Sequence, residues 1–598
     1  MDWQAPTAGS LRTSFHPQIL TCMRVHTYLL VCLLFLPFSL LGQYHWATQS
    51  GGDGAEATDV AIDAFGNSYV VAKFTGTTTF DGITLVEDGT VNDQGPLVLV
   101  KYSPSGAVIW ATPIRGKTAS EIHGVTIDAN GQVYVCGGYD HTNDFTKLDF
   151  GHGIILEGNA STSVFLAMAD SMGTFQWATR ILATDAPGSQ YIIPYDVVAD
   201  ANDGVYIIGE VLEPVDIDGQ SFNTNNPDRN QLFVAKYETD GDFLWFRHTD
   251  NAGQFGRAGG RTLALAPNGG VYFAGTFTRE ISYEGETIPP LTYSNEALVV
   301  GALSAAGALN WWRWVENAGS GGQAAHEFGV DGAGNLYVDI RGQGNTSLMD
   351  TAFFASVNRY LVKYDPNGNR QFVKPMFTSG FQGIQVHTLL TRPDGTTYAI
   401  GGHGTSEVIF GADTLPVVNP YGEHYFVAGY TSDGTLLGVH PLMDSTHNDL
   451  NSGVFTTMEA TSVQLTPQGS LLLTGFFEGK AYAGADSLDS EGLVEDMFLM
   501  DFSPSGLWLT PTTALASLPS TTWHVYPNPA TDVLYIRSER PFDEGVTATL
   551  LNLQGQTVLQ QWVQVEDSLS LAHLPAGMYV LRLSAGRAQV SYKIKKGR

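Results

Sequence analysis

Hydrophobic and polar residues alternate along most of the chain in short runs, which Asp, Asn and Gly separate. The stretch DVAIDAFGNSYVVAKF at Asp59 holds two such runs around a turn, and GVTIDANGQVYVCGGY at Gly124 repeats the plan. Alternation with a period of two is typical of β-strands, and Asp-x-x-Gly or Asn-Gly provides a tight hairpin turn. Because no helical period accompanies these runs, the pattern predicts an all-β protein.

The hairpin recurs at intervals of 61 to 74 residues, and its second strand carries a tyrosine in six copies and a leucine in the seventh. These residues are Tyr69, Tyr134, Tyr206, Tyr272, Tyr337, Tyr398 and Leu472. Each copy continues with a third strand, such as LVLVKY at Leu97, and a fourth strand. In four copies the fourth strand has a tryptophan four residues after a glycine: Trp110, Trp177, Trp245 and Trp311. A four-stranded unit cannot bury both faces alone, so we predict a seven-bladed β-propeller with the tryptophans packed between blades.

The repeats resemble the short β-propeller repeats (SBBP type) of exported bacterial proteins. The resemblance rests on elements such as D-x-x-G-N-x-Y-V at Asp63 and Asp331, covers residues from about 44 to 511, and implies a fold without a chemistry. The segment QYHWATQS after Gly42 matches a fourth strand without its three predecessors, so it can pair into the final blade and close the ring. A competing fourth strand, GLWLTPT at Gly506, leaves the choice of closing strand open.

The N-terminal region has the plan of an export signal. Met23-Arg24 precedes an apolar run that ends near Gly42, which predicts a signal peptide at 23–42, with 1–22 as a misassigned upstream start. The run is too short for a membrane span, so no transmembrane segment is expected in the mature chain. Cys136 is then the single cysteine left, and its strand pattern predicts a buried thiol.

The charge balance limits the possible partners. Sixty acidic and thirty basic residues give a formal charge of −30. Such a field repels nucleic acid and anionic membrane surfaces, so both are excluded as main partners.

A linker rich in Thr, Ser, Ala and Pro at 512–520 separates the expected propeller, 43–511, from a different pattern at 521–598. Three pieces, PNPA at Pro527, NLQGQTV at Asn552 and LPAGMYVLRL at Leu574, resemble the type A sorting domain of the type IX secretion system. The resemblance implies a C-terminal β-sandwich, recognition by the outer-membrane translocon, and processing by a surface sortase. An accessory β-sandwich such as a carbohydrate-binding module is the alternative. The expected sorting residues are Pro527, Asn528, Pro529, Gly555, Gly577, Tyr579, Lys593, Lys595 and Lys596.

Familiar catalytic motifs are not found. The sequence has no G-x-S-x-G, P-loop or dinucleotide fingerprint, and HEFGV at His326 lacks the second histidine of a zinc helix motif. Asp216-Ile217-Asp218-Gly219 looks like part of a calcium loop, but tight turns use the same residues. We therefore predict no catalytic residues, no resident metal and no cofactor.

One position, eleven residues before each repeat tyrosine, is polar in every copy. The residues there, called the mouth ring below, are Thr58, His123, Tyr195, Arg261, His326, His387 and Thr461. If first strands line the propeller axis, these side chains surround one mouth and could hold a sugar or a peptide, and His326 and His387 could share a metal. Alternatively, the polar residue only marks where a strand leaves solvent.

Three functions remain open from sequence alone. The first is a secreted or surface-displayed binding protein for protein or polysaccharide, without enzymatic activity. The second is a polysaccharide hydrolase or lyase that acts at the channel mouth, and the third is a structural cell-surface component. The mature chain is expected outside the cell, released or attached to the outer surface.

Overall fold

The computed structural model divides the chain into two compact bodies, Met1–Leu507 and Trp508–Arg598. Every regular element among the described residues is a β-strand, as predicted. The described residues are 43–503 and 523–597, apart from 88–95, 117–119, 140–146, 158–161, 185–191, 201–203, 213, 224–228, 268, 292–295, 318–327, 349–350, 378–383, 404–407, 411–412, 416–423, 446–457, 484–485, 491–493, 528–529, 539–545, 553–556, 564–566 and 586–587.

The described strands of the N-terminal body group into seven repeats of four antiparallel strands each. Repeats 1 to 4 are β3 (Ala55–Ile62), β4 (Ser68–Phe74), β7 (Leu97–Tyr102) and β8 (Val108–Gly116); β9 (Ser120–Ile127), β10 (Val133–Tyr139), β13 (Ser163–Ala169) and β14 (Phe175–Ala183); β15 (Ile192–Ala199), β16 (Gly204–Val211), β19 (Gln231–Glu238) and β20 (Phe243–His248); and β21 (Asp250–Leu265), β22 (Val271–Tyr283), β24 (Ala297–Leu303) and β25 (Leu309–Asn317). Repeats 5 to 7 are β26 (Phe328–Val330), β27 (Leu336–Leu348), β28 (Thr351–Tyr364) and β29 (Arg370–Pro375); β30 (Ile384–Thr391), β31 (Thr397–His403), β34 (His424–Tyr430) and β35 (Leu436–Ser445); and β36 (Met458–Leu465), β37 (Leu471–Phe477), β40 (Asp496–Ser503) and β1 (Gln43–Gln49).

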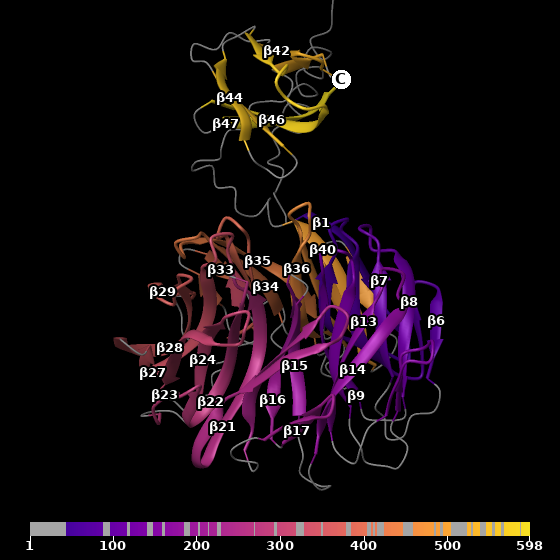
Figure 1. Ribbon diagram of the computed structural model, residues 1–598, viewed down its shortest axis with the longest axis vertical. Coiled ribbons are helices and arrows are strands. Elements are labelled where there is room, and N and C mark those ends of the chain that lie inside the picture. The colour runs from indigo at the N-terminus through magenta and orange to yellow at the C-terminus, as the bar shows by residue number, and fades with distance from the viewer. Residues whose placement is uncertain are drawn as a thin grey trace, which may run out of the picture. The chain divides into compact units, whose positions relative to one another are not determined.

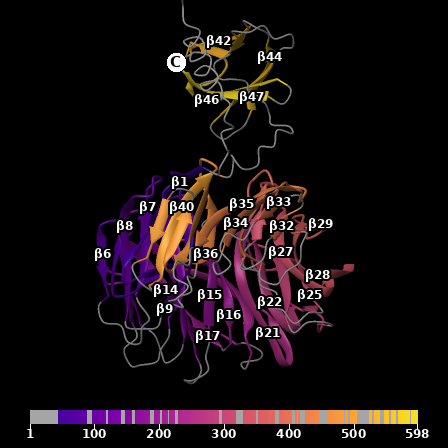
Figure 2. The same ribbon diagram turned by 180° about the vertical axis from the view of Figure 1, so that it is seen from behind.

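The first strands of the repeats contact one another in a closed cycle. β3 contacts β9, and the series continues through β15, β21, β26, β30 and β36, which contacts β3 again. Figures 1 and 2 show the sheets side by side in this order. The arrangement is propeller-like, with the first strands innermost.

The N-terminal strand closes the cycle. β1 pairs antiparallel with β40, with Gln43 opposite Ser503 and Gln49 opposite Phe498, so it is the fourth strand of repeat 7 (Figure 2). The competing segment at Gly506 lies outside the described residues. Closure by strands from both ends of the body joins regions more than 440 residues apart, as the Gln49 Nε2 to Asp489 carbonyl bond illustrates.

Small hairpins between the second and third strands extend the sheet of the preceding repeat. β11 (Lys147–Asp149) pairs with β8, β17 (Val215–Ile217) with β14, and β38 (Lys480–Ala483) with β35. Their partners in the hairpins are β12 (Ile155–Glu157), β18 (Gln220–Phe222) and β39 (Asp486–Asp489), and related short strands are β2 (Gly51–Gly52), β5 (Thr77–Phe80), β6 (Ile83–Val86), β23 (Glu286–Ile288), β32 (Val408–Phe410) and β33 (Asp413–Leu415). The hairpins cover part of otherwise open outer edges.

Each fourth-strand tryptophan packs on the turn of the next repeat. The indole N–H of Trp177 donates to the carbonyl of Thr239 at 3.1 Å, and a Cβ atom on Gly241 would lie 3.0 Å from the ring. Gly241 has a φ of 94°, so this turn favours glycine for its backbone as well as for the space. The same contact joins Trp46, Trp110, Trp245 and Trp311 to carbonyls of Pro104, Ser171, Ala305 and Pro366. These contacts agree with the prediction that the tryptophans pack between neighbouring repeats.

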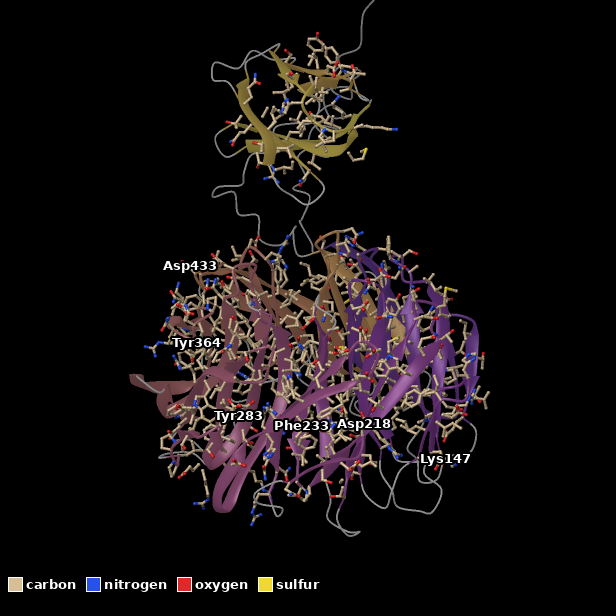
Figure 3. All side chains as sticks on the ribbon, in the orientation of Figure 1. Lys147, Asp218, Phe233, Tyr283, Tyr364 and Asp433 are labelled. Atoms are coloured by element: carbon tan, nitrogen blue, oxygen red, sulfur yellow. The ribbon has the colours of Figure 1, made fainter. Side chains whose placement is uncertain are left out.

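Large apolar side chains fill the space between repeats. Phe233 is fully buried and stacks on Phe246 with ring centroids 5.3 Å apart (Figure 3). One buried cluster joins second and third strands of repeat 2 to those of repeat 3, including Tyr134, Leu166 and Ile207. Neighbouring sheets are therefore held face to face by continuous apolar layers.

The C-terminal body has two sheets around one apolar cluster. The three-stranded sheet consists of β41 (Trp523–Tyr526), β42 (Val533–Ser538) and β45 (Asp567–Ser570), and the four-stranded sheet of β43 (Val546–Leu551), β44 (Thr557–Val563), β46 (Gly577–Ala585) and β47 (Ala588–Lys596). Leu534 and Ile536 from the first sheet and Leu550, Leu581 and Ile594 from the second are all fully buried in that cluster.

We expect Trp46→Ala to lower the free energy of unfolding of the N-terminal body by about 2 kcal/mol, because it leaves a gap over the Gly106 turn at the closing strand. Trp46→Phe keeps a ring there and loses only the hydrogen bond to Pro104, so about 1 kcal/mol is expected. Urea unfolding followed by fluorescence measures both. Wild-type stability of the alanine variant would contradict this role of the closing strand.

Candidate functional site

The mouth ring residues occupy β-bulges. The pairing of first and second strands skips one residue in each described case, for example between Pro194 and Asp196 opposite Gly209 and Ile208. The skipped residues are Thr58, His123, Tyr195, Arg261, His387 and Thr461. His326 lies outside the described residues. A bulge redirects a side chain out of the regular alternation, so the repeated polar position is a structural feature of the backbone.

A glycine lies opposite five of the six described bulges, and Ala72 takes this place opposite Thr58. A Cβ atom on Gly209 would lie 2.0 Å from the carbonyl oxygen of Ile193, two residues before the bulged Tyr195. The equivalent glycines, each three residues after the repeat tyrosine or leucine, are Gly137, Gly275, Gly401 and Gly475, with the same clash at 1.9 to 2.3 Å. This spacing was visible in the sequence, and sequence reasoning did not use it.

The innermost strands enclose a cavity of about 1000 Å³. First-strand residues from all seven repeats line it, and five mouth ring residues are among them: Thr58, His123, Tyr195, Arg261 and Thr461. His387 does not line the cavity, because its imidazole stacks on Tyr425 of β34 at a centroid distance of 5.4 Å. His326, which with His387 was the candidate pair for a shared metal, lies outside the described residues.

Three large side chains form a stacked wall on one side of the mouth. The guanidinium carbon of Arg261 lies 4.1 Å from the centroid of the Tyr195 ring, and the His123 ring lies 5.6 Å from the same ring. The residues come from the consecutive repeats 2, 3 and 4, and we call them the mouth wall. Arg261 covers the phenol ring by a cation–π contact, and His123 packs against the same ring.

Acidic groups hold the mouth wall in place. The Tyr195 hydroxyl donates to Oε1 of Glu210 at 2.9 Å, and His123 Nε2 lies 3.4 Å from Oε2 of Glu121. The neighbouring His123 side chain lowers the pKa of Glu121 below its ordinary value. Glu296 and Thr276 also line the cavity, so donors and acceptors are interleaved there.

The two threonines of the mouth ring bond to backbone carbonyls, and the bond of Thr461 links repeat 7 to repeat 1. The hydroxyl of Thr461 donates to the carbonyl of Ala57 in repeat 1 at 3.1 Å, and that of Thr58 donates to the carbonyl of Val71 at 3.3 Å. The mouth is therefore asymmetric. Small hydroxyl groups line the side of repeats 7 and 1, and the mouth wall lines the side of repeats 2 to 4.

Two buried carboxyl groups link neighbouring repeats directly below the mouth. Asp59 accepts the backbone N–H of Val60 and, from repeat 2, that of Val125, both at 2.8 Å. Asp196 accepts the N–H of Val197 and, from repeat 4, that of Leu263, both at 2.7 Å. All four N–H groups belong to the second residue after a bulge, so each carboxyl satisfies two donors in two repeats. Sequence reasoning missed both residues, although an Asp directly follows the mouth ring position in these two copies.

The deeper part of the cavity is mostly apolar, with Thr126, Thr391 and Gln464 as its polar lining residues. Residues that line it three or four positions after the mouth ring include Ile62, Ile127, Val198, Leu265, Val330 and Leu390. At about 3.3 Å per residue these side chains lie roughly 10 to 13 Å from the mouth ring along the strands. Most polar contacts of a ligand would therefore be made at the mouth.

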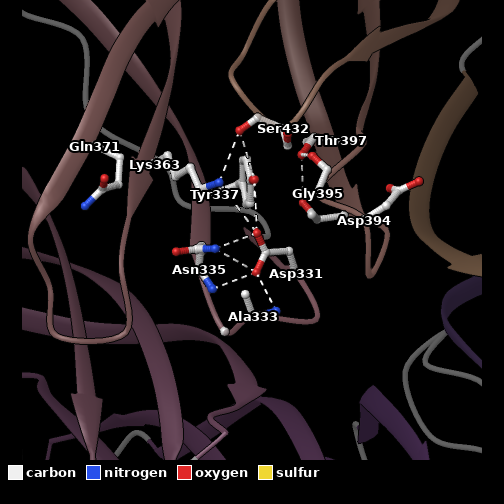
Figure 4. Close-up of polar contacts among 12 residues, drawn as sticks. Asp331, Ala333, Asn335, Tyr337, Lys363, Gln371, Asp394, Gly395, Thr397 and Ser432 are labelled. Atoms are coloured by element: carbon white, nitrogen blue, oxygen red, sulfur yellow. Dashed lines mark hydrogen bonds and ion pairs between the residues drawn. The ribbon is translucent and has the colours of Figure 1, made fainter. Parts of the chain in front are cut away.

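The turn aspartates have structural partners. Asp331 accepts backbone N–H bonds from Ala333 and Asn335, both at 2.9 Å, and the Tyr337 hydroxyl at 3.1 Å (Figure 4). Among the described residues no group of three or more His, Cys, Asp or Glu side chains could hold a metal ion. Cys136 is fully buried and burial raises the pKa of its thiol well above the ordinary value, which makes it a poor nucleophile.

The sorting residues converge on one segment of the C-terminal body. The N–H of Ala530 donates to the carbonyl of Lys595, and the N–H of Gly597 donates to the carbonyl of Ala530. Lys596 is buried, with its ammonium 3.5 Å from Asp532 Oδ1, whereas Lys595 is exposed. Pro527 and Gly577 are exposed, and Tyr579 is buried and donates to the carbonyl of Pro575. Asn528, Pro529 and Gly555 lie outside the described residues, as does the side chain of Lys593.

Residues 524–596 match the family described as the secretion system C-terminal sorting domain. The C-terminal body is a secretion system sorting domain. The type IX assignment made from sequence is confirmed for this domain, and its presence indicates export through that system to the cell surface or the extracellular space. Among the described residues, no helix has the length and apolar character that a membrane crossing requires.

Relatives of the rest of the chain are distant. An uncharacterized WD repeat-containing protein of Acanthamoeba polyphaga mimivirus is 26% identical over 170 residues, which are 27% of this chain and 11% of that protein. Among solved structures, an ulvan lyase of a polysaccharide lyase family is 8% identical with a TM-score of 0.37, covering 72% of this chain and 93% of the lyase. YCF48 bound to a peptide is 12% identical with a TM-score of 0.32, covering 77% and 96%. A member of the DUF4221 family from Bacteroides vulgatus is 9% identical with a TM-score of 0.28, covering 77% and 97%.

The buried carboxyl groups predict a pH dependence of stability. Burial raises the pKa of Asp59 to about 6 and that of Asp196 to about 7, from the ordinary value of 3.8 for an aspartate. Because the folded state holds these protons more tightly than the unfolded chain, their contribution to stability is greatest below about pH 4 and is lost as the pH rises through 6 and 7. We expect the urea midpoint to fall between pH 5 and pH 8, and Asp196→Asn to reduce that slope.

Asp433→Asn provides the matched control for this measurement. A hydrogen bond from Thr431 is the main cause that lowers the pKa of Asp433 to about 2, so this group titrates outside the measured range. The control variant should keep the wild-type slope. Asp196→Asn should also lower stability by about 2 kcal/mol at pH 5, because an amide N–H₂ cannot accept a backbone N–H. An unchanged slope in Asp196→Asn would contradict the assignment.

Proposed function

We propose that the chain is an exported binding protein that holds a polysaccharide at the polar mouth of its central cavity and does not cleave it. The N-terminal body would be a seven-bladed β-propeller of the SBBP type, from about 43 to 511, and the C-terminal body, 521–598, a sorting β-sandwich removed or used for surface attachment. The observation that carries the proposal is the mouth wall of His123, Tyr195 and Arg261 on bulges beside a cavity of about 1000 Å³.

The chemistry of the mouth suits sugar hydroxyl groups. An imidazole, a phenol, a guanidinium and the carboxylates Glu210 and Glu296 supply donors and acceptors within one rim. Because Arg261 lies over the Tyr195 ring and His123 packs against it, the tyrosine would contact a ligand through its edge and hydroxyl instead of through a free ring face. A protein segment is the other ligand class that the same rim could hold.

Binding is favoured over hydrolysis by the state of the cavity carboxyl groups. Asp59 and Asp196 line the cavity, but each uses both oxygens to accept backbone N–H bonds. A glycosidase needs one carboxyl group to donate a proton and a second to attack or to activate water. These two groups are poorly suited to either role, and Glu296, the other carboxyl group of the described lining, does not by itself make the pair that hydrolysis needs.

The test is a melting-temperature screen of the purified mature chain with a neutral glucan, a uronate-rich polysaccharide, a sulfated polysaccharide and a mixed peptide pool. A ligand that binds the folded state raises the melting temperature. Arg261→Ala should lower the affinity for that ligand by about tenfold, as expected for the loss of one charged hydrogen-bonding contact of about 1.4 kcal/mol. The bound polysaccharide should be recovered without new chain ends.

Arg247→Ala is the matched control, because Arg247 also lies over an aromatic ring, Trp245, but does not line the cavity. It should bind like the wild type. New chain ends in the recovered polysaccharide would favour the hydrolase or lyase, and self-association without any thermal shift would favour a structural component. Equal binding by wild type and Arg261→Ala would remove the mouth wall from the proposal.

A further inference from the structure

Two tyrosines stand on the solvent face of the three-stranded sheet in the sorting domain. Tyr526 of β41 and Tyr535 of β42 are opposite each other in register, and their rings stack with centroids 5.8 Å apart and an interplanar angle of 26°. Their exposed fractions are 47% and 48%. The adjacent strand residues Leu534 and Ile536 are fully buried in the apolar cluster, so the two tyrosines point away from that cluster.

The two rings, called the tyrosine face below, lie outside the apolar core and are about half exposed. The cluster is formed by other residues of both sheets and does not contain either ring. Stacked, half-exposed tyrosines offer a large, rigid contact area that loses little side-chain entropy on binding, which is why tyrosine is enriched at protein interfaces. In a domain matched to a secretion system, such a surface is suited to binding another protein.

The neighbouring sorting residues point to the same place. Tyr526 directly precedes the exposed Pro527, and Ala530, three residues further on, is bonded to Lys595 and Gly597. The ammonium group of Lys596 is withdrawn to Asp532 and is not free for a receptor. The PNPA motif, which bonds to residues 595 and 597 through Ala530, therefore begins directly after a residue of the tyrosine face.

We propose that Tyr526 and Tyr535 form the face by which the type IX translocon recognises this sorting domain, through an apolar protein surface that packs on the two flat rings. The proposal rests on the sorting-domain match and on the geometry of the two rings, and it is independent of what the cavity binds. Lys596 acts as a positioning residue that holds the chain end against Ala530.

The test measures secretion of the full chain in a bacterium with a working type IX system. Tyr526→Ser with Tyr535→Ser should lower the amount in the medium and on the surface by at least about tenfold, as truncation of aromatic interface anchors does. The chain should accumulate in the periplasm with a protease-resistant C-terminal body. Tyr526→Phe with Tyr535→Phe keeps both rings and should be secreted within twofold of the wild type.

Phe65→Ser with Met172→Ser removes two exposed apolar side chains of the N-terminal body and should leave secretion unchanged. If the double serine variant loses its protease-resistant C-terminal body, Tyr535→Lys decides, because its aliphatic stem still covers β42 while the ring is gone. Normal secretion of the folded serine variant or of Tyr535→Lys overturns the proposal. Poor secretion of the double phenylalanine variant also overturns it, because the translocon would then recognise the hydroxyl groups and not the rings.

Discussion

The contact between a fourth-strand tryptophan and the glycine turn of the next repeat is the interaction on which the N-terminal body depends. It recurs from Trp46 to Trp311, and each copy joins two sheets that share no strand pairing at that point. A single repeat has two apolar faces and cannot be stable alone. Trp46 lies on β1, the fourth strand of repeat 7, and contacts the turn at Pro104 in repeat 1. Its contact therefore joins the last repeat to the first.

Closure determines the site. The first strands meet around one axis and bring their backbones close together, and the bulge in each of the six described cases interrupts the regular pairing and turns one side chain out of it. The bulge leaves a backbone N–H that needs an acceptor, and Asp59 and Asp196 each provide one to two repeats. The mouth wall is thus a consequence of how the ring is held together, and its polar side chains are added to positions that the backbone already singles out.

The sequence predicted the strands, the hairpin turns, the packing of the tryptophans and the sorting domain, because each of these has a local spacing or motif. It did not predict the bulges, although a one-residue skip shifts the alternation, so that Tyr195 and Asp196 are half-buried in succession. It also placed His387 with the other mouth ring residues, whereas stacking on Tyr425 removes it from the cavity. Asp59 and Asp196 looked like ordinary polar residues, since their partners come from repeats about 66 residues away.

The ends of each body complete it. β1 and β40 close the N-terminal body, and the bonds of Ala530 with Lys595 and Gly597 join the start of the sorting domain to its last residues. Contacts between distant residues form late, because the loop between them must be closed first. Neither body is complete before its last strand has been synthesised, so a chain with a finished sorting domain already contains every strand of the N-terminal body. Because the sorting domain follows the N-terminal body in the chain, a chain that is exported through this domain carries the whole N-terminal body.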